Sequence, residues 1–303
     1  MEELMKLESF ELAIKDRGAK PISIGTLERE LLKKYPASDA EEWDKTGLLV
    51  GDRRENITKV AVALDPTISA VRAAANAGAN LLLTHHPVYR GGIEGFYPLD
   101  DLECASPSNV VYEAIARGIA LMNFHTALDV SVAAHRVLPS LLHVKRCKLP
   151  VLFNGKVKKY ATLSPLDGSK KKGYGQFVYF EDRMTLGDLA RRCVSVFGKK
   201  PRVWGDMRAK IQTGACATGS AGDLVKRSIE AGIDVLICGE VRYHDALAGI
   251  ESGCSIVELG HDLSELPLAA LLANDSKNVG LRKSQIILLD QSHNWQLPDA
   301  IRI

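Results

Sequence analysis

The chain has 303 residues, 46% of them hydrophobic and 25% charged, and a formal net charge of +2. This length and composition are typical of a globular protein with one large core or two smaller ones. The near-neutral charge gives no general reason to expect nucleic-acid binding, although it does not exclude a local basic patch. No apolar run has the length of a signal peptide or a membrane span, so we expect a cytoplasmic protein that does not enter membranes.

The six cysteines agree with a cytoplasmic location. They form no C-x-x-C pair, and several stand inside apolar runs, where small buried thiols are common. We therefore expect reduced thiols rather than disulfides. These residues are Cys104, Cys147, Cys193, Cys216, Cys238 and Cys254.

The N-terminal part is predicted to contain a polar extension, residues 1–24, followed by a helix. Thr26 can cap this helix, which should end at Tyr35 because a proline follows. Trp43 and Asp44 then lie in a segment rich in glycine. We interpret this segment as a turn anchored by a buried tryptophan.

Strands and helices alternate from there to residue 145. The expected strands cover 59–64, 80–84 and 119–123, and the expected helices cover 68–76, 110–117 and 132–142. The first strand–helix–strand unit should be parallel with a right-handed crossover. The long loop at 87–107 is rich in glycine and aromatic residues and would act as a lid, cover the core or contact another subunit.

The second part of the chain begins with strands and then returns to alternation. The expected strands cover 149–153, 157–163, 175–180, 200–204, 210–213, 234–238, 254–259 and 285–289. The expected helices cover 186–197, a segment ending at 231, 243–251 and 262–273. The glycines of 214–222 could present N–H groups to an anion, although a tight turn is the simpler interpretation.

A weak internal repeat relates the two parts. Residues 76–84 resemble residues 230–238, and each stretch precedes a helix, an apolar strand and a His-x-x-x-acid pattern. The repeat predicts an α/β protein with two similar three-layer halves and mixed sheets, facing each other around a cleft. The expected halves are residues 25–145 and 146–303.

The ends of three predicted strands carry the residues that point to chemistry. His85 and His86 end the strand at 80–84, and because neighbouring side chains on a strand point to opposite sides, the pair can serve two adjacent metal ions. For an isolated pair, one surface histidine and one hydrogen-bonded histidine would be the better interpretation.

Two further patterns make a shared metal site the stronger interpretation. His125 and Asp129 follow one apolar strand, and His261 and Glu265 follow another. Positions i and i+4 of a helical turn share a face and can bind one metal. A mixed set of imidazole and carboxylate ligands suits zinc, iron or manganese better than calcium.

Five motifs, in this order, resemble the signatures of the Nif-three-like proteins, also labelled GTP cyclohydrolase 1 type 2 homologs or dinuclear metal centre proteins. They are Trp43-Asp44-x-x-Gly47-Leu48-x-Val50-Gly51, Thr84-His85-His86-Pro87, His125-Thr126-Ala127-x-Asp129, Gly239-Glu240-x-x-x-His244 and Gly260-His261-x-x-x-Glu265. The resemblance implies two α/β halves around a two-metal site and a ring-shaped homohexamer. Some relatives insert a domain between the halves, but the spacing from Asp129 to Glu265 is too short for one here.

The resemblance also implies a role for each motif residue. His85 and Asp129 would bind one metal ion, His86 and His261 the other, and Glu265 would bridge the two. His125 and His244 would lie nearby as catalytic candidates that hold ligands or carry protons. The alternative, that each is a buried hydrogen-bonded histidine, carries equal weight.

Two divalent transition metal ions held in this way would share a water molecule and lower its pKa. The leading hypothesis is therefore a metal-dependent hydrolase, with a nucleotide such as GTP, a phosphoester or a cyclic compound as its substrate. The alternative is a non-catalytic metal-binding scaffold that recruits protein partners. Nucleic-acid binding inside a ring would require a basic inner wall.

Overall fold

The computed structural model describes residues 21–93, 95–99, 105–147, 151–153, 156–167, 169–296 and 298. Most of the predicted N-terminal extension, part of the loop at 87–107 and Cys104 lie outside these ranges. Among the described helices, none is long and apolar enough to cross a lipid bilayer. The five cysteines within the described ranges are all free thiols, as expected.

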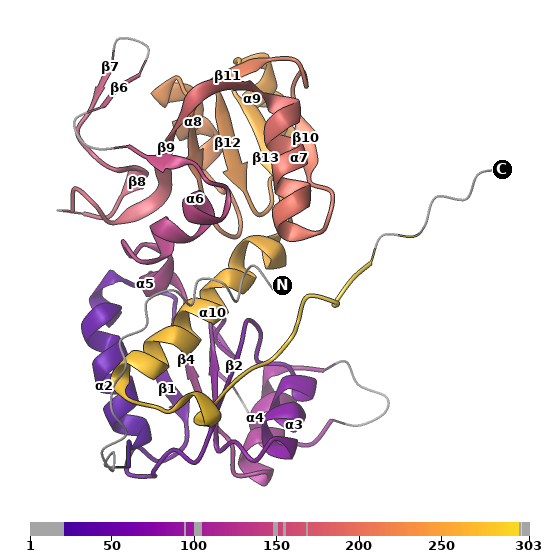
Figure 1. Cartoon of the computed structure of the whole chain (residues 1–303). Coiled ribbons are helices and arrows are strands. Elements are labelled where there is room, and N and C mark those ends of the chain that lie inside the picture. Colours follow the sequence, from indigo (N-terminus) through magenta and orange to yellow (C-terminus); the bar gives the residue numbers. More distant parts are fainter. Residues whose placement is uncertain are drawn as a thin grey trace.

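The first sheet has five strands in the order β1-β4-β3-β2-β14, and it is mixed because only β1 runs antiparallel to its neighbour. Its strands are β1 (Gly47–Val50), β2 (Val60–Ala63), β3 (Leu81–Thr84), β4 (Ala120–Asn123) and β14 (Ile286–Leu288). Helix α2 (Ile24–Lys34) covers one face, and α3 (Ile68–Asn76) and α4 (Pro107–Ala116) cover the other (Figure 1).

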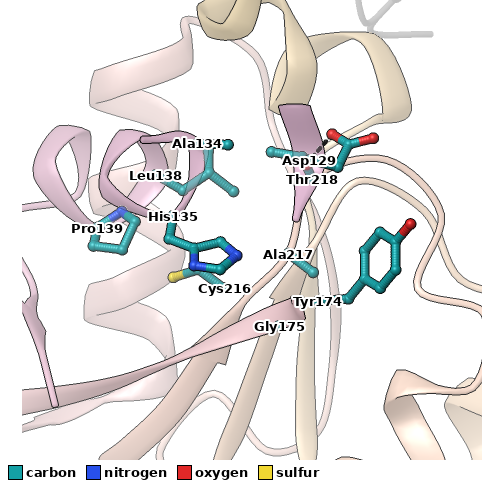
Figure 2. Close-up of a pocket in the computed structure, with 10 residues that line it drawn as sticks. All are labelled: Asp129, Ala134, His135, Leu138, Pro139, Tyr174, Gly175, Cys216, Ala217 and Thr218. Atoms are coloured by element: carbon teal, nitrogen blue, oxygen red, sulfur yellow. Dashed lines mark hydrogen bonds between the residues drawn. The ribbon is translucent and has the colours of Figure 1, made fainter. Parts of the chain in front are cut away.

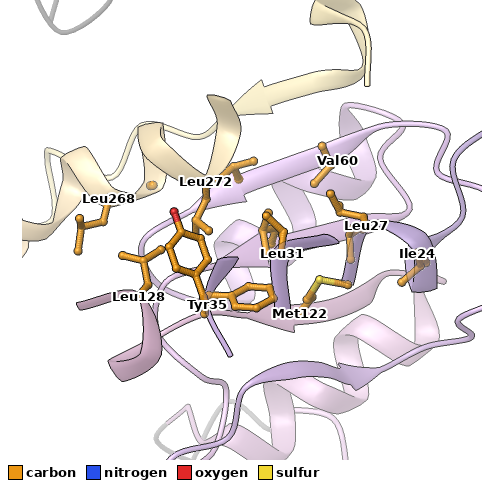
Figure 3. Close-up of a cluster of buried hydrophobic side chains, with 14 of the residues drawn as sticks. Ile24, Leu27, Leu31, Tyr35, Val60, Met122, Leu128, Leu268 and Leu272 are labelled. Carbon is orange, nitrogen blue, oxygen red and sulfur yellow. The ribbon is translucent and has the colours of Figure 1, made fainter. Parts of the chain in front are cut away.

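Alternating side chains of the central strands supply both cores of this sheet. Leu81 and Leu83 of β3 point into the cluster that includes Leu27 and Leu31 of α2, drawn in Figure 3. Leu82, between them, points into the opposite cluster with α3 and α4. Both faces of the sheet are therefore buried, which fits the continuous apolar run that the sequence shows here.

The second sheet has the order β10-β13-β12-β11-β9-β5, with β8 paired to β9. Its strands are β5 (Lys145–Arg146), β8 (Thr162–Pro165), β9 (Gly173–Thr185), β10 (Arg202–Trp204), β11 (Lys210–Cys216), β12 (Val235–Cys238) and β13 (Ser255–Glu258). Helices α8 (Leu224–Ala231) and α9 (Tyr243–Glu251) cover one face, and α7 (Leu186–Phe197) packs on the other. A separate hairpin joins β6 (Val151–Phe153) to β7 (Lys156–Lys158).

The two sheets contain the same parallel unit. The order β2-α3-β3-α4-β4 in the first sheet corresponds to β11-α8-β12-α9-β13 in the second. In each sheet the last strand of the unit pairs antiparallel with a short edge strand, β1 or β10. The chain is thus an α/β protein with two mixed sheets, and the carboxyl ends of its parallel strands carry the histidine motifs.

The chain crosses between the sheets twice. Short helices α5 (Thr126–Asp129), η3 (Ala134–Arg136) and α6 (Val137–Leu141) lead from the first sheet to the second. Helix α10 (His261–Val279) leads back, and β14 then pairs with β2 (Figure 1). The predicted boundary between residues 145 and 146 falls inside β5, and the segment from α10 to β14 packs with the first sheet although the prediction assigned it to the second half.

Several predicted element bounds were wrong for local reasons. Helix α2 begins at Ile24 because Ser23, not Thr26, caps it and accepts a hydrogen bond from the Thr26 N–H. The predicted helix at 132–142 is instead two short helical pieces, with Pro139 in the first turn of α6, where its missing N–H costs nothing. The predicted strand at 157–163 is divided between β7 and β8.

Candidate metal centre

The central strand of the first sheet delivers the histidine pair. Beyond the last residue of β3, the N–H groups of His85 and His86 still donate to the carbonyls of Ala63 and Leu64, which extends the ladder with the β2 side. The His85 side chain is fully buried, while 15% of the His86 side chain is exposed. The protein's own hydrogen bonds therefore fix the backbone of both histidines at the end of the sheet.

The structure brings all five predicted ligand residues together. His85 Nε2 lies 3.5 Å from Asp129 Oδ1 and 3.8 Å from Glu265 Oε1. Glu265 Oε2 lies 2.9 Å from His86 Nε2 and 3.1 Å from His261 Nε2. These residues form two groups whose ligand atoms lie within 4.8 Å of one another, one with His85 and Asp129 and one with His86 and His261. Both groups include Glu265, and either could hold a metal ion.

Each of the three histidines predicted as ligands is held by a hydrogen bond at Nδ1. The partners are the Phe124 carbonyl for His85 (3.0 Å), Asp65 for His86 (2.7 Å) and Glu240 for His261 (3.0 Å). Because these oxygens only accept, each Nδ1 carries the hydrogen, and in the neutral ring Nε2 keeps a lone pair that faces the cluster.

Asp65 and Glu240 were not predicted as site residues. Asp65 follows β2 and Glu240 follows β12, so both stand just beyond the carboxyl ends of parallel strands that neighbour the histidine motifs. That position was the signal that could have identified them.

Two buried atoms of the cluster have no hydrogen-bond partner among the described residues, His85 Nε2 and Glu265 Oε2. The short contacts of Glu265 Oε2 with the two imidazole nitrogens lack hydrogen-bond geometry. Lone pairs that face one another in a buried site are costly unless a proton or a cation lies between them. The residues present thus fit divalent metal ions with nitrogen and oxygen ligands.

The charges of the cluster without metal agree with this fit. Burial favours the neutral form of His86, but the hydrogen bond with Asp65 and the nearby Glu265 carboxylate outweigh it and raise the pKa of His86 to about 10. The Glu265 carboxylate, 3.1 Å from Nε2, raises the pKa of His261 to about 9 against the effect of burial. Burial opposes ionisation of Glu265, yet the three histidines hold its pKa well below the usual range. Metal ions would therefore replace protons on these rings.

Asp44, rather than Trp43, anchors the segment before β1. The Asp44 side chain is buried and accepts hydrogen bonds from the N–H (2.9 Å) and Oγ1 (2.5 Å) of Thr126 at the start of α5. Burial opposes its ionisation, but these bonds and His125 lower the pKa of Asp44 to about 2. Trp43 is 47% exposed, so the predicted buried tryptophan was wrong.

The two predicted catalytic histidines have different surroundings. His125 is buried, its Nδ1 lies 3.2 Å from Asp44 Oδ1, and its ring centre lies 5.2 and 5.3 Å from those of His85 and His86. His244 is exposed on α9 and contacts the ring of Tyr243, and it belongs to none of the candidate ligand groups found in the described ranges. The catalytic role of His244 stays a prediction, and among the described residues no contact joins it to the cluster.

The glycine-rich segment after β11 lies against Glu265. Gly219 has a φ of +61°, and a Cβ there would lie 2.2 Å from Glu265 Oε1. Its N–H donates to Ser264 Oγ at 2.9 Å, one residue before the carboxylate. Glycine is therefore required at this position both by backbone conformation and by the close approach of the shared ligand.

A small pocket adjoins Asp129 (Figure 2). Its lining includes His135, Tyr174 and Thr218, and Thr218 Oγ1 donates to Asp129 Oδ1 at 3.3 Å. His135 Nε2 donates to the Gly173 carbonyl at 2.6 Å, which leaves the buried Nδ1 as an acceptor without a partner among the described residues. Burial lowers the pKa of His135 to about 4, so the ring is neutral. No motif in the sequence marked this residue as part of a site.

Comparison with known proteins agrees with the motifs. Residues 22–294 match the family model described as Duf34/NIF3 (NGG1p interacting factor 3). A Streptomyces coelicolor protein named "GTP cyclohydrolase 1 type 2 homolog" is 28% identical over 87% of this chain and 85% of its own length. The "NGG1-interacting factor 3" of Saccharomyces cerevisiae is 24% identical over 79% of this chain and 85% of its own.

A solved structure shares the fold. The crystal structure of a hypothetical protein from Staphylococcus aureus superposes with a TM-score of 0.74 at 23% identity. The match covers 92% of this chain and all of the other one. The arrangement of two mixed sheets is thus one that this structure and the Staphylococcus aureus protein have in common.

Proposed function

The chain belongs to the Duf34/NIF3 family, and on that premise we propose that it is a dinuclear metal-dependent hydrolase. The observation that carries the proposal is the close approach of nitrogen and oxygen atoms around Glu265, two of which, His85 Nε2 and Glu265 Oε2, have no hydrogen-bond partner among the described residues. Imidazole Nε2 atoms and carboxylate oxygens approach within 2.9–3.8 Å while their Nδ1 atoms are committed to other partners. In the proposed arrangement, two similar α/β halves face each other around this cluster.

The chain's own residues divide the work. His85 and Asp129 would hold one ion, His86 and His261 the other, and Glu265 would bridge them. Divalent ions bound there supply Lewis acidity, which lowers the pKa of a water molecule and prepares it for attack. Asp65 and Glu240 orient two of the imidazoles, as partners of metal-binding histidines generally do.

His125 is the candidate proton carrier. Asp44 fixes its Nδ1, so its Nε2 is the nitrogen free to exchange a proton with a group at the cluster. Asp44 is ionised at neutral pH and can stabilise the protonated imidazole that follows proton uptake. His125 would thus act as the base and the Asp44 carboxylate would orient it, an arrangement that recurs in hydrolases.

The name of the Streptomyces coelicolor relative supports a nucleotide such as GTP as the substrate. A phosphoester or another cyclic compound would suit the same residues. We further propose, from the family resemblance, that the protein assembles as a homohexamer. Size-exclusion chromatography with light scattering tests this state directly.

The test of the proposed activity uses protein loaded with zinc, iron or manganese. Metal analysis should give about two ions per chain, and a panel of nucleotides and phosphoesters should reveal a metal-dependent hydrolysis. Asp129→Asn and Glu265→Gln should each abolish turnover. Asp262→Asn is the matched control, because Asp262 lies in the same first turn of α10 but bonds the Trp295 indole instead. Turnover that survives removal of both ions would refute the proposal.

A second candidate is a metal-binding regulator without catalysis. The name of the Saccharomyces cerevisiae relative, which denotes an interaction with another protein, favours it. Full metal occupancy with no turnover over the whole panel, together with a stoichiometric protein partner, would support this candidate over the hydrolase.

A further inference from the structure

Trp43 is an exposed aromatic side chain beside the candidate metal centre. Its ring centre lies 5.7 Å from that of His125, edge to face, and 47% of the residue is exposed. The ring of His125 in turn lies against His85 and His86. A ligand that reaches the cluster on this side would meet the indole.

The backbone that carries Trp43 is fixed on both sides. The Asp44 side chain is tied to Thr126, and the Asp44 N–H donates to the Glu41 carbonyl at 2.9 Å. The Glu41 N–H donates to Thr126 Oγ1 at 3.0 Å. The exposure of the indole is therefore set by an anchored segment rather than by a loose loop, and it leaves a large apolar ring in water at a defined place.

Arg90 places a cation on the same indole. Its guanidinium carbon lies 5.2 Å from the Trp43 ring centre, and the side chain is exposed. Arg90 follows His86 by four residues, so the chain leads from the histidine pair directly to this side chain. Within the described ranges no carboxylate pairs with it, which leaves its planar donor set available to an anion.

We propose that Trp43 and Arg90 form a substrate clamp that selects nucleotides. The base stacks on the indole, and a phosphate group pairs with the Arg90 guanidinium, which presents the nucleotide to the cluster beneath. The inference rests on the proposed hydrolase and narrows its substrate class. Stacking of a base on an aromatic side chain is tolerant of base identity, so the clamp selects for a planar ring with an anionic tail rather than for guanine alone.

The test compares three probes on metal-loaded protein by calorimetry: GTP, guanosine and tripolyphosphate. Trp43→Ala should weaken GTP and guanosine about ten-fold or more and leave tripolyphosphate within two-fold. Arg90→Gln should weaken GTP and tripolyphosphate and leave guanosine unchanged. Trp43→Phe should retain most of the GTP affinity, because a smaller aromatic ring still stacks.

Trp204→Ala is the matched control. Arg202 lies over Trp204 at 5.8 Å, so the same pair of residue types is present, but Trp204 stands on β10 and donates to Glu258, whereas the Trp43 ring lies against His125. This variant should bind all three probes like the wild type. Metal content and oligomeric state are measured for every variant.

Three results would overturn the clamp. One is wild-type affinity of Trp43→Ala for GTP, and another is wild-type protein that binds neither GTP nor guanosine. The third is a change of oligomeric state in Trp43→Ala with unaltered nucleotide affinity, which would make the indole a subunit contact. If the clamp is refuted, metal-dependent hydrolysis of phosphoesters that lack an aromatic ring would still support the proposed hydrolase. GTP binding that depends on Trp43 and Arg90, without any turnover, would support the clamp and contradict the proposed hydrolase.

Discussion

The two sheets share one topology but contribute unequally to the cluster. The first supplies enclosed ligands: His85 has no exposed side-chain surface, and Asp129 has 10%. The second leads into α10, which supplies the shared carboxylate Glu265, 4% exposed, and His261, 38% exposed. One copy of the repeated fold unit therefore supplies largely buried candidate ligands, whereas the other leads into one buried residue, Glu265, and one more exposed residue, His261. The proposed function thus depends on the residues at and beyond the strand ends rather than on the topology that presents them.

The sharpest test of this division compares the shared ligand with a ligand from one side. Glu265→Gln should lower metal content from about two ions per chain to less than one, because two of the three candidate groups include this carboxylate and the third, His85 with His86 and His125, has no carboxylate. Asp129→Asn should remove only the ion beside His85. Metal analysis after gel filtration measures both. Equal losses in the two variants would contradict the shared role of Glu265.

The glycine that lies against Glu265 gives the next largest effect. Gly219→Ala should weaken metal binding strongly, since the added Cβ would displace the carboxylate. Gly222→Ala is the control: Gly222 also has a positive φ, +47°, but a Cβ there meets nothing within 4 Å. Both variants should lose about 1 kcal/mol of unfolding free energy from backbone strain. Only Gly219→Ala should lose metal, as measured by calorimetric titration with zinc.

The carboxylates of Asp65 and Glu240 test whether metal affinity depends more on the histidine orientation of the first sheet than on that of α10. Asp65→Asn and Glu240→Gln should each weaken metal binding by about 10- to 100-fold, because the imidazoles lose a fixed orientation. The effect should be larger for Asp65, which is 33% exposed, than for Glu240, which is 51% exposed. Competition with a chromophoric chelator measures both affinities. A larger loss of affinity in Glu240→Gln than in Asp65→Asn would contradict the proposed difference between the two sheets.

The smallest expected effect is a pH dependence of the metal-free protein. The folded-state pKa values of His86 and His261, about 10 and about 9, lie above the ordinary value of 6.5. Protonation of these rings therefore stabilises the metal-free fold fully below about pH 6.5. This stabilisation is lost as the pH rises through 9 and 10.

Thermal unfolding across this pH range provides the measurement. The Tm of the metal-free protein should fall between pH 7 and 10, and His86→Gln should flatten the curve more than His261→Gln. The metal-loaded protein binds neutral imidazoles, so its Tm should exceed that of the metal-free form by a margin that grows with pH. A margin that shrinks with pH would contradict the assignment of protons to these rings.

The sequence was informative where local signals decide the structure. The predicted helices at 68–76, 186–197 and 243–251 have the bounds of α3, α7 and α9. Thr67 and Thr185 cap the first two, and Gly198 ends the second. The i, i+4 pattern also placed His261 and Glu265 on one face of α10, where they contact each other.

Long-range contacts account for what could not be predicted. Asp44 accepts a hydrogen bond from the N–H of Thr126 across 82 positions, and the neighbouring Trp43 is exposed. His125 and Asp129 have different partners because α5 has only four residues and His125 stands at its N-cap, outside the regular turn. The pairing of β14 with β2 joins segments more than 220 residues apart, which no local pattern encodes.

Helix α10 has a mechanical consequence. Its first turns carry His261 and Glu265, and two turns further Leu268 and Leu272 are buried in the core of the first sheet (Figure 3). Asp275, near its end, accepts hydrogen bonds from Lys34 and Tyr35 at 2.6 Å each. The Glu265 carboxylate thus stands near the start of a helix about 28 Å long whose far end is held against the core of the first sheet. A hinge motion of one sheet relative to the other would move this carboxylate relative to His85, so we expect retention of the proposed metal ions to depend on how rigidly α10 is held.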